Sequence, residues 1–155
     1  SFKIQTMLNF LRTNSTHQDF ITLVRQLDVE LATIDGDEHS FYAQYNKIDK
    51  INHVIIAYEN ELPIACGAIK QFSENTMEVK RMYTLASYRG KRIASGVLIQ
   101  LEKWAAEMNY SHCILETGIR QPDAIRLYEK NGYLPIPNYG QYGGVENSRC
   151  FEKKL

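Results

Sequence analysis

Apolar residues after His17 recur at the spacing of an amphipathic helix. They are Phe20, Leu23, Val24, Leu27, Leu31 and Ile34. The pattern predicts a helix with Thr16 as its N-terminal cap, broken at residues 35–37. We expect an opening strand over residues 2–8, and a second short helix at the aromatic residues Phe41, Tyr42 and Tyr45.

In the middle of the chain the period changes from that of a helix to that of strands. Three runs rich in β-branched residues, His53–Tyr58, Leu62–Gln71 and Met77–Thr84, are separated by the polar turns 59–61 and 73–75. Short strands joined by tight turns are typical of an antiparallel meander.

The second half alternates helix and strand. Residues Ile93, Val97, Leu101, Ala105 and Met108 predict an amphipathic helix, and His112–Glu116 a short buried strand. Pro122 favours the start of another helix, which Asn131-Gly132 ends. A loop at Tyr139–Gly144 precedes a last strand at Arg149–Lys153. We therefore expect one domain over residues 1–155, of the α/β (α+β) class, with a mixed sheet and helices on its faces.

The composition narrows the choice of partners and compartment. The 18 basic residues balance the 18 acidic ones, so no overall field points to nucleic acid or a membrane surface. No apolar run approaches the roughly 20 residues of a membrane span, and the first residues lack the apolar core of a secretory signal. The cysteines Cys66, Cys113 and Cys150 are far apart and form no CxxC pair, which argues against a metal site and favours a reducing, cytoplasmic location.

The segment Tyr88–Gly96 (YRGKRIASG) is the strongest local candidate for a binding site. It lies between a predicted strand and a predicted helix, so a turn at Gly90 can present unpaired backbone N–H groups at the helix N-terminus to a phosphate. The neighbouring Arg89, Lys91 and Arg92 add positive charge. An ordinary helix start with solvated basic residues is the alternative. The segment lacks the ending of a Walker A loop and is no Rossmann fingerprint, which disfavours a nucleotide triphosphatase.

Three stretches together resemble one known family. Met77–Leu98, Ile114–Gly118 and Asp123–Pro135 have the order and spacing of the GCN5-related N-acetyltransferase (GNAT) superfamily, and the resemblance covers roughly residues 53–135. It implies a mixed, mostly antiparallel sheet with helices on both faces. It also implies an acyltransferase that uses acetyl-CoA as cosubstrate and needs no metal.

The resemblance assigns cofactor contacts to two segments. The family loop, (Gln/Arg)-x-x-Gly-x-(Gly/Ala), holds the pyrophosphate of coenzyme A, and its counterpart here is Arg89, Gly90, Lys91, Arg92, Ile93 and Ala94, followed by Ser95. Arg92 replaces the usual central glycine, and a side chain is tolerable there if its φ is helical and it points outward. The strand residues Met82, Tyr83 and Thr84 match the positions that pair with the pantetheine arm. Gln121 stands where many members have an asparagine that contacts the cofactor, although it could instead cap the following helix.

The same resemblance suggests the groups that move protons. Acyl transfer to an amine needs a polarised carbonyl, for which the N–H of Met82 is the candidate. It also needs an acid for the leaving thiolate and a base for the amine. Tyr128 is the candidate acid, and core packing is its alternative. Glu78 is the preferred base, directly or through water, and an ion pair with Lys80 or Arg81 is the alternative. Strand alternation places Glu78, Lys80, Met82 and Thr84 on one face unless a bulge intervenes.

The acceptor side is less defined. In this fold the amine enters between segments that correspond to residues 30–42 and 137–144. Their acidic residues could attract a cationic amine, and tyrosines could line the pocket; these are Glu30, Asp35, Asp37 and Glu38, with His39 beside them, and Tyr139 and Tyr142.

The sequence therefore predicts an N-acetyltransferase that acts on a primary amine of a small molecule. Acetylation of protein lysines or N-termini, and a non-catalytic acyl-CoA sensor, are the alternatives. A homodimer is expected by analogy alone, and neither a nucleic acid nor a membrane is expected as a partner.

Overall fold

A seven-stranded sheet in the order β1-β2-β3-β4-β5-β7-β6 forms the centre of the protein. The computed structural model describes residues 7–36 and 50–155. All strand pairs are antiparallel except β4 with β5, so the predicted mixed, mostly antiparallel sheet is confirmed. The strands are β1 (Leu8–Thr13), β2 (His53–Glu59), β3 (Leu62–Ser73), β4 (Thr76–Thr84), β5 (His112–Gly118), β6 (Leu134–Ile136) and β7 (Ser148–Lys154). The helices are α1 (Gln18–Asp35), α3 (Ile93–Glu107) and α4 (Pro122–Lys130), with the 3-10 turns η2 (Ala86–Tyr88) and η3 (Gly140–Tyr142).

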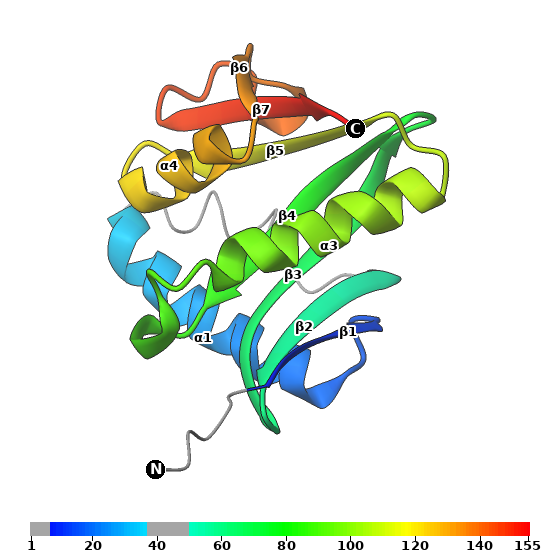
Figure 1. Cartoon of the computed structure of the whole chain (residues 1–155). Coiled ribbons are helices and arrows are strands. Elements are labelled where there is room, and N and C mark those ends of the chain that lie inside the picture. Colours follow the sequence, from blue (N-terminus) through cyan, green and yellow to red (C-terminus); the bar gives the residue numbers. More distant parts are fainter. Residues whose placement is uncertain (1–6, 37–49) are drawn as a thin grey trace.

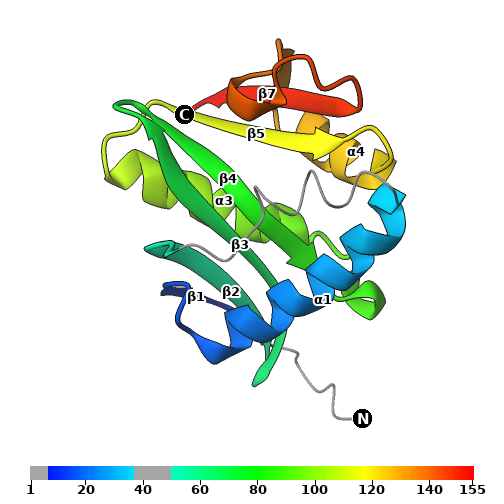
Figure 2. The same ribbon diagram turned by 180° about the vertical axis from the view of Figure 1, so that it is seen from behind.

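The helices cover the two faces of this sheet. Figure 1 shows α3 and α4 on one face, and Figure 2 shows α1 crossing the other. We call these the α3 face and the α1 face. The core of the α3 face includes Val97, Leu98 and Leu101 of α3 with Ile55, Ile69 and Leu115 of the sheet. The core of the α1 face includes Phe20, Leu23 and Val24 with Val54, Ile56 and Ala68. Within the described part of the chain, no helix is both long and apolar enough to cross a bilayer.

Several predicted boundaries differ from those observed. The cap of α1 is His17, whose Nδ1 accepts a hydrogen bond from the Asp19 N–H (3.1 Å), so the prediction of Thr16 was wrong. The Thr16 hydroxyl instead donates to the Asn14 side chain (2.6 Å), which precedes the helix. The first described strand begins at Leu8, whereas most of the expected strand over residues 2–8 lies outside the described residues, as does the helix expected at Phe41, Tyr42 and Tyr45. The short edge strand β6 was not predicted.

A β-bulge in β4 decides which side chains reach which face. Arg81 has a left-handed φ of 61°, and here the register with β3 shifts, so that β4 has one residue more than β3. Glu78 and Lys80 alternate with the core residues Met77 and Val79 and point to the α1 face. Met82 instead lies on the α3 face, where a Cβ added to Gly67 would be 2.5 Å from its sulfur. The bulge considered in the sequence analysis is therefore present, and it moves Met82 away from the face that strict alternation of Glu78, Lys80, Met82 and Thr84 would give it.

The parallel strands β4 and β5 pair with each other over only a few residues. Residues 76–78 of β4 pair with residues 112–114 of β5, and beyond them neither strand has a ladder partner in the other. From Val79 onward, β4 therefore presents an edge of backbone N–H and C=O groups toward β5. This separation forms the site described next.

Candidate active site

A cavity of about 120 Å³ lies where β4 and β5 separate, and both faces of the sheet contribute to its walls. From the α3 face come Met82, Gln121, Ala124 and Tyr128. From the α1 face come Asp35, Glu78, Lys80, Glu116 and Tyr142. The structure thus brings both predicted catalytic residues, Glu78 and Tyr128, to one cavity.

Tyr128 of α4 forms part of the core and part of the cavity wall. Its ring centroid lies 5.9 Å from that of Tyr133 and 6.4 Å from that of Phe151, and only 6% of the residue is exposed. Its hydroxyl makes no hydrogen bond to any residue that the structure describes. Burial, and then the negative charge of Glu116, raise the pKa of Tyr128 above its ordinary value. The hydroxyl therefore keeps its proton at neutral pH and has it available to donate.

Glu78 is held by two neighbours on the α1 face. The Tyr139 hydroxyl donates a hydrogen bond to its Oε2 (2.6 Å), and the Lys80 ammonium lies 3.8 Å from its Oε1. Its side chain is only 12% exposed. Arg81 instead lies 3.9 Å from Asp28 of α1. The ion pair with Lys80 that was considered as an alternative is therefore present, in addition to the position of Glu78 at the cavity.

Glu116 of β5 is a third ionisable group of the cavity, and sequence reasoning missed it. It follows the core residue Leu115, so its side chain points to the α1 face, where Ser148 donates a hydrogen bond to its Oε2 (2.7 Å). Burial is the main reason that the pKa of Glu116 is raised to about 7, and the charges of Asp35 and Glu78 act in the same direction. The available signal was a carboxylate directly after the apolar run Cys113–Leu115.

The predicted phosphate loop lies at the N-terminus of α3. Gly90 and Arg92 both have left-handed backbone angles, with φ of 78° and 64°. The helical φ that would make a side chain tolerable at Arg92 is therefore not observed, and a conformation that favours glycine is adopted by a residue with a Cβ atom. The side chains of Lys91 and Arg92 are exposed, whereas that of Ile93 is in the core. The first N–H groups of α3, at Ile93, Ala94 and Ser95, precede the first intrahelical bond, so they point out of the helix end where an anion is favoured.

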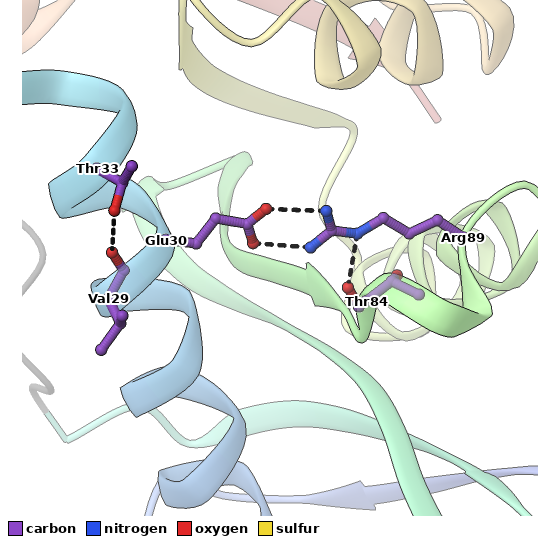
Figure 3. Close-up of polar contacts among 5 residues, drawn as sticks. All are labelled: Val29, Glu30, Thr33, Thr84 and Arg89. Carbon is purple, nitrogen blue, oxygen red and sulfur yellow. Dashed lines mark hydrogen bonds and ion pairs between the residues drawn. The ribbon is translucent and has the colours of Figure 1, made fainter.

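Arg89 is directed away from the helix end. Its Nε donates to the Thr84 carbonyl (2.9 Å), and its two terminal nitrogens donate to the Glu30 carboxylate of α1 (2.8 and 2.7 Å; Figure 3). The guanidinium also lies 5.6 Å from the ring of Tyr83, which packs against the core of the α1 face. Arg89 thus connects the end of β4 to α1, and a contact with the cofactor stays a prediction.

Two further predicted residues have defined surroundings. Gln121 occupies the N-cap position of α4, but its side chain makes no capping hydrogen bond and instead lines the cavity. Ser95 accepts a hydrogen bond from Asn131 at the end of α4 (3.1 Å), which ties together the two helices of the α3 face.

The expected amine side is formed mainly by aromatic and acidic residues. Tyr139 stacks edge-on against Phe72 (5.1 Å between centroids) and against Tyr142 (5.7 Å). Of the expected acidic residues, Asp35 lines the cavity, whereas Glu30 is paired with Arg89. Asp37, Glu38 and His39 lie outside the described residues.

Comparison with known proteins gives consistent matches over most of the chain. The family model described as "Acetyltransferase (GNAT) family" matches residues 21–133. An IAA acetyltransferase of Azospirillum brasilense is 30% identical over 137 residues, which cover 87% of this chain and 90% of that protein. A Klebsiella pneumoniae structure, provisionally assigned as an acyl-CoA N-acyltransferase, has a TM-score of 0.81 at 28% identity and covers 96% of this chain and 98% of its own. The PaiA N-acetyltransferase of Thermoplasma acidophilum, in complex with coenzyme A, shares the fold at 17% identity, with a TM-score of 0.72 and coverage of 96% and 99%.

Proposed function

Because this chain belongs to the acetyltransferase (GNAT) family, we propose that it transfers an acetyl group from acetyl-CoA to the primary amine of a small molecule. The observation that carries the proposal is the cavity between β4 and β5. It has a protonated tyrosine on one wall and carboxylates on the other, and acyl transfer to an amine needs one group that donates a proton and one that accepts it.

The residues around the helix end suit acetyl-CoA. The first N–H groups of α3 and the exposed Lys91 and Arg92 favour a pyrophosphate, and the open edge of β4 from Val79 to Thr84 offers backbone groups to an extended amide-containing arm. When bound, acetyl-CoA supplies an acetyl group activated as a thioester. Gln121 and Ala124 close the same side of the cavity.

Within the cavity each residue has a separate task. The Tyr128 hydroxyl donates its proton to the departing sulfur, and the carboxylates of the α1 face, Glu78 among them, accept the proton of the amine directly or through water. The backbone N–H of Met82 follows the bulge and is the proposed donor to the thioester oxygen, a contact often worth about 3 kcal/mol.

A small acceptor is favoured over a protein. The Azospirillum relative is named as an acetyltransferase of IAA, which supports a small-molecule substrate. The presence of Tyr128 and three carboxylates in one cavity speaks against a non-catalytic sensor, since a sensor has no need of them.

The test is a library of amines and short peptides, with thiol release from acetyl-CoA as the measurement. We expect release with one class of small primary amine and none with peptides, whereas release with lysine-containing peptides alone would favour protein acetylation. Acetyl-CoA without an amine should raise the melting temperature, because a ligand at 100 times its Kd stabilises by about 2.7 kcal/mol. No shift far above micromolar concentration would rule out cofactor binding.

A further inference from the structure

Two consecutive basic residues of β4, Lys80 and Arg81, both direct their side chains to the α1 face. In a regular strand consecutive residues point to opposite faces, but the bulge at Arg81 interrupts this alternation. The Lys80 ammonium lies 3.8 Å from Glu78. The Arg81 guanidinium lies 3.9 Å from Asp28 of α1. Both basic residues line the cavity, with side chains that are only 14% and 3% exposed, so two nearly buried positive charges directly precede Met82.

The β5 side of the gap carries negative charge on the same face. Two carboxylates line the cavity there, Glu116 of β5 and Asp35, the last residue of α1. The Asp35 carbonyl accepts a hydrogen bond from Arg120 (2.9 Å), which follows β5 directly and so holds the end of α1 beside this strand. The third carboxylate, Glu78, lies where β4 and β5 still pair, before the gap opens. Along the gap, the wall on the α1 face is therefore positive at β4 and negative at β5.

A ligand that matches this wall needs a negative and a positive charge close together. Arginine has five N–H donors and lysine three, so each can hold a ligand carboxylate together with its present partner. A guanidinium binds a carboxylate through two parallel hydrogen bonds, which a neutral group does not offer. In an α-amino acid a single carbon atom separates the carboxylate from the amino group, so one small molecule presents both charges to the two sides of the gap.

We propose that the acceptor is an α-amino acid, whose carboxylate binds Lys80 and Arg81 and whose amino group lies toward Glu116 and Asp35. The inference rests on the proposed function, since it names the class of amine that this cavity accepts. The same contact disfavours proteins as acceptors. A protein N-terminus has a peptide bond in place of the carboxylate, and the amine of a lysine side chain has no carboxylate near it.

The first test compares amino acids with their amides and with the amines that lack the carboxyl group, at saturating acetyl-CoA. Leu27 and Leu31 also line the cavity, so leucine, leucinamide and isopentylamine are the first set. We expect kcat/KM for the amino acid to exceed that of both analogues by about 10- to 100-fold, the effect of a charged hydrogen-bonded contact. The amine of the amide is less basic, so reactivity alone would favour the amide. An amide that reacts as well as its amino acid would overturn the proposal.

Substitutions in β4 locate the contact with the carboxylate. Arg81→Met and Lys80→Met should each lower kcat/KM for the amino acid by about 10-fold or more, mainly by raising KM. The loss with the amide should be smaller, so the ratio between the two acceptors falls. Arg81→Lys keeps the charge but not the two parallel hydrogen bonds, so it should recover part of that ratio. Arg25→Met is the matched control, because Arg25 is an exposed residue of α1 that does not line the cavity.

The ratio between the acceptors separates this contact from damage to the fold, because a damaged enzyme loses activity with both. A ratio that is unchanged in both Arg81→Met and Lys80→Met would overturn the proposal. If Arg81→Met does not fold, Lys80→Met and the native enzyme still supply the comparison. Thiol release with simple amines but with no amino acid would overturn the proposal and leave the proposed function in place, whereas no release with any acceptor would contradict the proposed function instead.

Discussion

The two walls of the cavity are built in different ways. The wall on the α3 face combines the open backbone edge of β4, from Val79 to Met82, with Gln121, Ala124 and Tyr128 at the start and along α4. The wall on the α1 face consists of side chains from α1, β4, β5 and the turn η3, which lie far apart in the sequence. A backbone site keeps its donors when side chains change. A site made of side chains changes with each substitution, so selection of the amine is expected to depend on the α1 face.

The electrostatics of the two walls differ as well. Exposed Lys91 and Arg92 lie beside the helix end, whereas Asp35, Glu78 and Glu116 surround Lys80 on the opposite wall. An anionic cofactor and a cationic amine would thus each meet the opposite charge. Substitutions that act on one wall and spare the other can test this division.

The largest effect is expected from the only proposed catalytic side chain on the α3 wall. Tyr128→Phe should lower kcat by about 100- to 1,000-fold, because the leaving sulfur loses its proton donor. The Kd for acetyl-CoA, measured by calorimetry, should stay within about twofold, because one hydroxyl is lost and the backbone donors remain. Unchanged turnover would reject the acid role.

Tyr133→Phe is the matched control for this change. The Tyr133 hydroxyl is also buried, but it donates to Glu102 of α3 (2.8 Å) and does not line the cavity. The control should cost roughly 1–3 kcal/mol of stability through an unpaired carboxylate oxygen and leave kcat near the native value.

A medium effect is expected at Arg92, whose left-handed backbone conformation is strained. A left-handed conformation costs a non-glycine residue about 1–2 kcal/mol, part of which glycine loses again through unfolded-state entropy. Arg92→Gly should therefore stabilise the protein by about 1 kcal/mol, or about 2–4 °C in Tm. It should also raise the Kd for acetyl-CoA a few-fold because a positive charge is lost, since a charge at a helix end contributes about 0.3–1 kcal/mol.

Arg92→Lys separates the two contributions. It keeps both the charge and the left-handed φ of 64°, so neither Tm nor Kd should change much. If Arg92→Gly were no more stable than Arg92→Lys, strain at this position would not be the cause.

Local patterns predicted the frame of the molecule but not the details of the site. The strands from His53 to Thr84, the helix that begins at Ile93 and the one that begins at Pro122 all follow from apolar period and turn residues, and the structure confirms them. The three-residue strand β6 is too short to show a period. It forms because β7 offers an edge to pair with, which is a tertiary effect.

The same limit applies to single residues of the cavity. The bulge at Arg81 depends on the register with β3, so no pattern within β4 placed Met82 on the α3 face. Glu116 looks like the polar end of a strand until Ser148 and Asp35, from distant segments, are placed beside it. The β4 part of the α3-face wall could be predicted because its residues are contiguous in the sequence. The wall on the α1 face could not, because its residues come together only in the folded chain.

The smallest effect concerns the contact that connects the two walls, the pair between Arg89 and Glu30 (Figure 3). The two side chains are 44% and 34% exposed, so the pair should contribute about 0.2–1 kcal/mol. Three of the five N–H groups of Arg89 donate to Thr84 and Glu30, so a phosphate would compete with Glu30 for this guanidinium. If the cofactor binds Arg89 in place of Glu30, Glu30→Gln should tighten acetyl-CoA binding by up to about fivefold, the equivalent of 1 kcal/mol. Glu107→Gln, which breaks an exposed pair with Arg12 at the other end of α3, should leave the Kd unchanged. An equally unchanged Kd in Glu30→Gln would mean that Arg89 does not bind the cofactor, and that its role is to hold the end of β4 through the Thr84 carbonyl.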